Sequence, residues 1–166
     1  MAVFLLSTKS SFRRRQDIRF KVRYECYILR KIGLYSMNER VRVLITDDQQ
    51  PTRQGLMALL SFTPQIEIIG VAVNGEEAVL MTGKYHPDVV LMDMKMPVMN
   101  GLQAAKLIKK RWPEIKIIAL TIYPYYRTEA VKSGIDAFLQ KGCAAEVLQS
   151  TILEANRSGA RYAKLR

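Results

Sequence analysis

The sequence predicts an α/β protein in which a doubly wound, five-stranded parallel sheet lies between two layers of helices. Five short runs rich in Val, Ile and Leu alternate with five stretches of helical periodicity, and the connections between them are short. The middle runs are almost continuously apolar, which is typical of strands that are covered on both faces. Strict alternation of strands and helices favours a parallel sheet between helices.

Each element is predicted by a local signal. A β-branched run over 41–46 indicates the first strand, and Pro64 ends the helix that follows it. Asn74 can cap the next helix, because Glu76 and Glu77 then lie in its first turn. The expected strands are 41–46, 66–72, 88–92, 115–120 and 137–140. The expected helices run from about 52 to before Pro64, over 76–81, from 102 to before Pro113, over roughly 126–132 and over 144–156.

The chain has 166 residues, which is enough for one ordinary domain with some sequence left over. Its formal net charge of +11 is unevenly distributed, because residues 1–36 carry nine basic and two acidic side chains whereas 37–166 carry seventeen and thirteen. We expect a basic N-terminal extension over 1–37, a folded domain over 38–156, and the start of a linker or a C-terminal tail over 157–166.

The basic segment allows several interpretations. Met37 directly precedes the first patterned segment, so the simplest interpretation is a mis-set translation start, with 1–36 outside the natural product. A basic arm that contacts nucleic acid or a membrane surface is the functional alternative, and an uncharacterised extension is the third.

Cysteine content and hydropathy exclude other classes of protein. Cys26 and Cys143 lie far apart and the chain has one His, so neither a disulfide scaffold nor a zinc-ligand set is present. No apolar run is long enough to cross a bilayer. Two free thiols in a reducing cytoplasm are the expected state.

Polar side chains follow four of the five predicted strands. Asp47 and Asp48 come after the first, Asp93 after the third, Thr121 ends the fourth, and Lys141 follows the fifth. Right-handed crossovers bring the carboxyl ends of parallel strands to one edge of the sheet, where ligands of such sheets bind. We therefore expect three carboxylates beside a hydroxyl and an ammonium group.

Clustered carboxylates require a cation, and a site of oxygen ligands with open positions for water suits Mg²⁺. A metal beside a carboxylate, a lysine and a hydroxyl is the arrangement that phosphoryl transfer requires. The carboxylate can then act as nucleophile and become an aspartyl phosphate. Each residue alone could be a helix cap or a solvated charge, but the combination at one edge favours this chemistry.

These residues lie in a pattern that resembles the receiver domain of response regulators in bacterial two-component signalling. The resemblance covers about 41–156 and implies a flavodoxin-like (βα)5 fold with strand order 2-1-3-4-5. The Asp-x-x-Met-Pro-x-Met-x-Gly block is its most specific part. The motifs that carry it are Leu44 to Asp48, Val90 to Gly101, Thr121, and Phe138 to Gly142.

The resemblance implies a function and a ligand set. Asp93 would accept a phosphoryl group from a sensor histidine kinase, so that the domain is a phosphorylation-dependent switch rather than a metabolic enzyme. Asp47, Asp48 and Asp93 would bind Mg²⁺, and Lys95 would contribute its backbone carbonyl. Self-phosphorylation and autodephosphorylation would be the only catalysis.

The resemblance also implies a switch. Thr121 and Lys141 would bind the phosphoryl group, and Phe138 would swing inward behind Thr121. The side chains of Lys95 and Tyr123 would flank the acyl phosphate and tune its lifetime. The face built from the fourth helix, the fifth strand and the fifth helix would then bind a second copy or an effector protein.

Two further segments, Arg53 to Leu56 and Gly159 to Tyr162, are similar to the branch of the family with LuxR-type helix-turn-helix output. After Asn156 only ten residues remain, too few for such a domain. Three accounts compete: a stand-alone receiver, a regulator cut short before its DNA-binding domain, and direct nucleic-acid binding through 1–36. DNA would be a partner of the receiver only with an output domain.

Several positions depart from the family pattern. Gln49 and Gln50 follow the acidic pair, Gly142 replaces the usual cis-proline after the lysine, and Phe138 has no hydroxyl. Pro124 lies in a shortened segment before the fourth helix. An enzyme is not indicated, because the chain has no GxxxxGK[ST] or GxGxxG loop, and Lys95 stands where an Asp-x-Asp phosphatase needs its second aspartate.

Overall fold

The computed structural model describes residues 40–122 and 132–157, and from Arg40 onwards the chain forms one compact unit. The elements of the described residues alternate between strand and helix, apart from the segment between the last two strands. They are β1 (Val41–Thr46), α2 (Gln50–Ser61), β2 (Ile66–Ala72), α3 (Gly75–Tyr85), β3 (Val89–Met92), α4 (Gly101–Arg111), β4 (Lys116–Thr121), β5 (Ala137–Gln140) and α6 (Ala145–Arg157).

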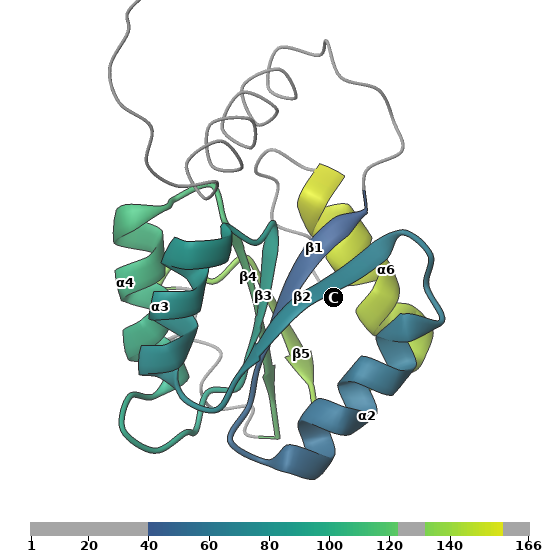
Figure 1. Ribbon diagram of the computed structural model, residues 1–166, viewed down its shortest axis with the longest axis horizontal. Helices are drawn as coiled ribbons and strands as arrows, with labels where there is room; N and C mark the ends of the chain where they lie inside the picture. Colours follow the sequence, from purple (N-terminus) through teal and green to yellow (C-terminus); the bar gives the residue numbers. More distant parts are fainter. Residues whose placement is uncertain (1–39, 123–131, 158–166) are drawn as a thin grey trace, which may run out of the picture. The chain divides into compact units, whose positions relative to one another are not determined.

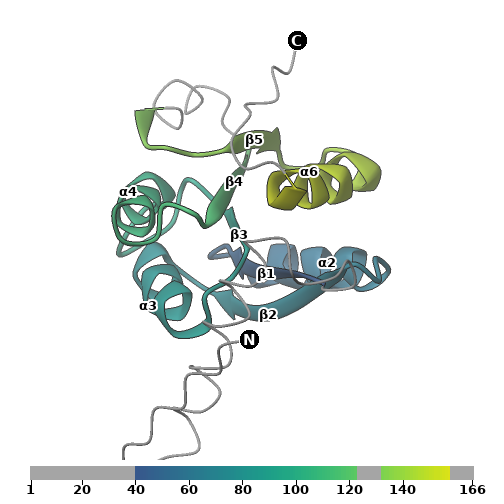
Figure 2. The same cartoon turned by 90° about the horizontal axis from the view of Figure 1, so that it is seen from above.

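The described elements form three layers. The sheet lies in the middle, with α3 and α4 on one face and α2 and α6 on the other (Figure 1). The view from above shows the same separation of the two helix pairs by the sheet (Figure 2). All strand pairs are parallel, and the order is β2-β1-β3-β4-β5, which confirms the predicted doubly wound sheet.

Alternate residues of the strands build two separate cores. On the α3/α4 face, Leu44, Val90 and Ile117 pack with apolar side chains of the two helices. On the α2/α6 face, Ile45 and Leu91 pack with side chains such as Leu60 and Ile152. Because successive side chains of a strand point to opposite faces, both must be apolar, which explains the nearly continuous apolar runs.

The helices begin or end at slightly different residues from those predicted. α2 begins at Gln50 rather than near Thr52, because Pro51 lies in its first turn, where the missing N–H removes no hydrogen bond. α3 is capped as predicted, since the Asn74 side chain accepts a hydrogen bond from the Glu77 N–H, and it continues to Tyr85 instead of ending near Met81. The helix predicted over 126–132 falls almost wholly outside the described residues.

Within residues 40–122 and 132–157, every helix is too short or too polar to pass through a lipid bilayer.

Candidate functional site

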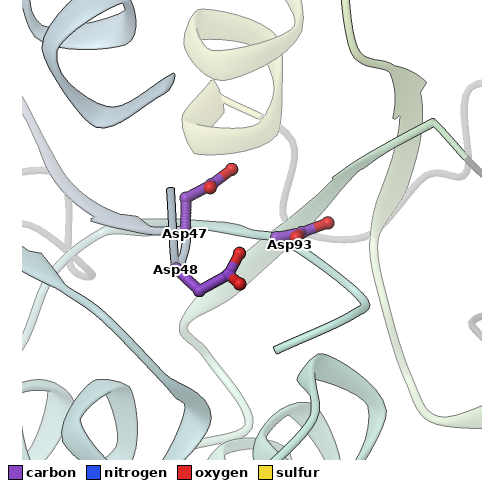
Figure 3. A group of neighbouring side chains, drawn as sticks. All are labelled: Asp47, Asp48 and Asp93. Atoms are coloured by element: carbon purple, nitrogen blue, oxygen red, sulfur yellow. The ribbon is translucent and has the colours of Figure 1, made fainter. Parts of the chain in front are cut away.

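Three carboxylates meet where β1 and β3 end. The Asp93 N–H donates to the carbonyl of Thr46, and the Asp47 N–H donates to that of Ala72, so the backbone ladder of the sheet continues into both aspartates. Asp47, Asp48 and Asp93 each offer a carboxylate oxygen within 4.8 Å of the others (Figure 3). Asp47 and Asp93 are buried and Asp48 is exposed, so the cluster has one open side.

Lys141 supplies the counter-charge from β5. Its Nζ lies 2.6 Å from Asp47 Oδ2 and 3.2 Å from Asp93 Oδ2. Its N–H donates to the carbonyl of Thr121, which ties the lysine to the end of the neighbouring strand β4. Gly142 follows at φ +87°, a left-handed conformation that favours glycine.

Burial and charge shift two of the ionisable groups. Desolvation raises the pKa of Asp93 above its ordinary value, and Asp47 adds to this, although Lys141 and the Met94 N–H oppose it. Burial by itself lowers the pKa of Lys141, but the carboxylates of Asp47 and Asp93 outweigh it and hold that pKa above its usual value. The site therefore keeps Lys141 charged and disfavours the ionised form of Asp93 until more positive charge arrives.

The loop after Asp93 is tightly constrained. The Met94 N–H donates to Asp93 Oδ1 at 2.8 Å, which orients the carboxylate. Gly101 begins α4 directly against the site, where a Cβ would lie 2.0 Å from the Asp93 carbonyl oxygen. Between them Val98 takes φ +66°, and the Met99 N–H closes a three-residue turn onto the Pro97 carbonyl at 2.7 Å.

The carboxylates open into a cleft of about 380 Å³. Its residues come from the carboxyl ends of β1, β3, β4 and β5 and from the loop after Asp93. They are Asp48, Gln49, Asp93, Lys95, Met96, Pro97, Ile122 and Lys141. A small anionic group can therefore reach both Asp93 and Lys141 from solvent.

The predicted switch residues lie behind or beside this cleft. Thr121 is 1% exposed at the end of β4, one strand away from Asp93. Phe138 is half-buried and packs against the core on the α3/α4 face. The Lys95 side chain is exposed on the rim of the cleft, whereas Tyr123 lies outside the described residues.

Sequence reasoning missed two contacts of Asp47. The Gln49 N–H donates to Asp47 Oδ1 at 2.9 Å, and Arg53 Nη1 donates to the Asp47 carbonyl at 2.8 Å. Gln49 acts through its backbone, which no side-chain pattern reveals. Arg53 follows Asp48 by five residues, and this spacing gives no signal that would have identified its contact with the Asp47 carbonyl.

The ligand set fits a hard divalent cation. All three side chains offer oxygen, two of them are buried in positions fixed by the backbone, and the exposed Asp48 leaves room for water. Lys141 pairs with two of the three carboxylates, those of Asp47 and Asp93, so it offsets part of the negative charge that a metal would neutralise. The residues thus fit the predicted Mg²⁺ in chemistry and arrangement.

Comparison with characterised proteins identifies relatives that are response regulators, in agreement with the geometry of the site. The family model of the response regulator receiver domain matches residues 43–153. The transcriptional regulatory protein DegU of Brevibacillus brevis is 34% identical over 131 residues, which cover 75% of this chain and 56% of DegU. The response regulator VraR of Staphylococcus aureus is 32% identical over 70% of this chain and 57% of its own length. The chain thus spans a little over half the length of these relatives.

Solved structures agree on the fold. The response regulator domain of Thermotoga maritima CheB is 29% identical with a TM-score of 0.69, over 74% of this chain and all of that chain. A LuxR-family DNA-binding response regulator from Staphylococcus aureus is 33% identical with a TM-score of 0.66, over 70% of this chain and 98% of that one. These matches confirm the predicted similarity to the LuxR-type branch. With the acidic cluster at the carboxyl edge of a 2-1-3-4-5 sheet, they show that this chain belongs to the response regulator receiver domain family.

Proposed function

We propose that this receiver domain is switched by phosphorylation of Asp93, with a sensor histidine kinase as the donor. The observation that carries the proposal is the position of Asp93: it is buried, oriented by the Met94 N–H, and placed beside both a cationic group and two further carboxylates at the mouth of an open cleft. This arrangement combines a nucleophile with stabilisation of the charge on a transferring phosphoryl group.

In the proposed transfer a carboxylate oxygen of Asp93 attacks phosphorus. The new bond joins that oxygen to phosphorus, and the bond between phosphorus and the donor's leaving group breaks, with its electron pair departing on the leaving group. Asp47, Asp48, Asp93 and the backbone carbonyl of Lys95 would hold Mg²⁺, which would neutralise charge on the phosphoryl oxygens. Lys141 would exchange its contact with Asp93 Oδ2 for one with a phosphoryl oxygen.

The resulting switch would run through β4 and β5. Phosphorylation replaces the single charge of the Asp93 carboxylate with a phosphoryl group that carries roughly −1.5 to −2 and would attract the hydroxyl of Thr121. Phe138, paired with Ala119 across the β4–β5 ladder, would then turn further into the α3/α4 core. The changed face would involve β5, α6 and the predicted helix near 126–132, and it would bind a second copy or an effector protein in the cytoplasm.

The rim of the cleft would set how long the phosphoryl group persists. The exposed Lys95 side chain and the predicted neighbour Tyr123 would hinder an attacking water in autodephosphorylation. Replacing Lys95 with Asn should change the dephosphorylation rate of the phosphorylated domain, measured by the decay of the phosphoryl adduct. An unchanged rate would remove Lys95 from this role.

Incubation with acetyl phosphate, with and without Mg²⁺, followed by intact mass measurement tests the proposal. We expect a phosphoryl adduct that requires Mg²⁺ and disappears in Asp93→Asn. Asp88→Asn is the matched control, because Asp88 lies at the opposite edge of the sheet and its Oδ2 accepts from the Arg42 N–H, which an amide oxygen can also do. An adduct that survives Asp93→Asn, or one that forms equally well without Mg²⁺, would contradict the proposal.

A further inference from the structure

Arg53 joins helix α2 to the first aspartate of the site. Its Nη1 donates to the backbone carbonyl of Asp47 at 2.8 Å, while its own N–H donates to the carbonyl of Gln49 and so begins the hydrogen bonding of α2. The side chain is half-buried, and it therefore reaches back along the turn that carries both Asp47 and Asp48.

Helix stability does not explain this arginine. Arg53 is the fourth residue of α2, where the positive end of the helix dipole disfavours a cation, and the first turn of α2 contains no acidic residue to offset it. Its hydrogen bond also goes to a neutral carbonyl rather than to a carboxylate. A residue that breaks a local rule in this way is expected at a functional site.

The contact completes the set of hydrogen bonds around Asp47. The Asp47 N–H is held by Ala72, Oδ1 by the Gln49 N–H, Oδ2 by Lys141, and the carbonyl by Arg53. That carbonyl belongs to the peptide that joins Asp47 to Asp48. The orientation of this peptide therefore sets the direction in which the Asp48 side chain leaves the backbone.

Asp48 depends on this peptide more than the other two carboxylates do. Asp47 and Asp93 are buried, with side chains fixed by N–H donors and Lys141, whereas Asp48 is exposed on the open side of the cluster. Movement of the turn would displace its oxygen from the other two. Groups that orient metal ligands without touching the metal commonly contribute about 10- to 100-fold in metal affinity.

We propose that Arg53 is a positioning residue for the metal site, which holds the Asp47–Asp48 peptide so that the Asp48 carboxylate faces the cation. This inference rests on the proposed function, because it assigns a residue to the Mg²⁺ site. Two effects oppose each other here. The charge of Arg53 repels a cation and its hydrogen bond orders a ligand, and the inference states that ordering is the larger effect.

Arg53→Met tests which effect is larger, because it removes both the charge and the donor but keeps an unbranched apolar side chain. Loss of the charge alone would tighten Mg²⁺ binding, and loss of the hydrogen bond would weaken it. Titration of the purified chain with Mg²⁺ by calorimetry should show a dissociation constant about 10-fold higher than that of the unchanged protein. Arg53→Lys retains the charge and one donor group, and its dissociation constant should lie between those of the other two proteins.

Arg42→Met is the matched control. The Arg42 guanidinium also donates to two backbone carbonyls, those of Tyr85 and His86, but it does so at the amino edge of the sheet. This variant should lose thermal stability in EDTA and keep its affinity for Mg²⁺. Arg53→Met should lose affinity for Mg²⁺, and this loss should be larger than its change in thermal stability in EDTA can explain.

The outcomes distinguish the inference from the proposed function. If the unchanged protein binds Mg²⁺ and Arg53→Met binds it equally well or more tightly, the positioning role is overturned while the phosphorylation proposal stands. Equal weakening in Arg53→Met and Arg42→Met would show a general structural effect and would also overturn it. If the unchanged protein binds no Mg²⁺, the proposed metal site fails and the role of Arg53 fails with it.

Discussion

Val98 shows how a single residue can be strained beside the site. Its φ of +66° is rare for a β-branched side chain, and that side chain is 79% exposed, so core packing does not hold it there. The turn is held instead by the hydrogen bond from Met99 to Pro97 and by the one from the Gly75 N–H to the Met99 carbonyl. The loop that follows Asp93 is therefore fixed from the start of α3.

Replacing Val98 with Gly should stabilise the domain. The strained backbone costs about 1–3 kcal/mol, and the greater freedom of glycine in the unfolded chain offsets about 0.5–1 kcal/mol of the gain. We expect an increase of about 1 kcal/mol in the free energy of unfolding, measured by urea denaturation. Val98→Ala, which keeps the strained φ, should show little change, and a loss of stability in Val98→Gly would contradict this explanation.

Among the elements, two glycines at helix positions differ in what an added side chain would meet. A Cβ at Gly101, the first residue of α4, would lie 2.0 Å from the Asp93 carbonyl oxygen and 2.8 Å from the Met94 side chain. A Cβ at Gly55 in α2 would have no heavy atom within 4 Å. α4 can approach the loop after Asp93 this closely only because Gly101 has no side chain.

Gly55→Ala and Gly101→Ala therefore form a matched pair. Gly55→Ala should raise the free energy of unfolding by about 0.5–1 kcal/mol, because alanine is the better helix former and meets no obstacle. Gly101→Ala should lower it and reduce the yield of the acetyl phosphate adduct, because the Asp93 backbone must move. Thermal unfolding and intact mass give the two readouts, and an adduct of normal yield in Gly101→Ala would show that the loop tolerates displacement.

At the level of the whole molecule, the carboxylate cluster should link the free energy of unfolding to pH and to Mg²⁺. The pKa of Asp93 is raised above its ordinary value of 3.8 chiefly by burial. A raised pKa means that the folded state favours the protonated form. The stability that protonated Asp93 contributes is fully present below pH 3.8, and it is lost as the pH rises through the pKa of Asp93 in the folded state.

Asp93→Asn should consequently be more stable than the unchanged protein at pH 7 in EDTA, and the difference should vanish below pH 3.8. With Mg²⁺ the unchanged protein should be the more stable of the two. A ligand at 100 times its dissociation constant stabilises the folded state by about 2.7 kcal/mol, and Asp93→Asn lacks one of the carboxylates that would bind the ion. Thermal unfolding at several pH values, with EDTA or with Mg²⁺, measures both effects. Lower stability of Asp93→Asn at pH 7 in EDTA would contradict the assigned cause of the shift.

Sequence patterns are enough to predict the layered fold and the edge of the sheet at which the charged residues meet. The two apolar faces of strands such as Val89–Met92 require cover on both sides, and parallel strands bring their carboxyl ends to one edge. Asp47, Asp48, Asp93 and Lys141 lie together at this edge, because strand polarity places them there and the strand order sets β1 beside β3.

The contacts that run through backbone atoms could not be predicted in this way and depend on the folded structure. No residue pattern shows that Arg53 reaches the Asp47 carbonyl, that the Gln49 N–H holds Oδ1, or that Val98 adopts a positive φ. Every residue has the same backbone carbonyl, and every residue except proline has the same N–H group, so their partners depend on the packing of α2 and α4 against the sheet edge. The sequence therefore determines which charges meet, and the packing of the helices decides how each carboxylate is held.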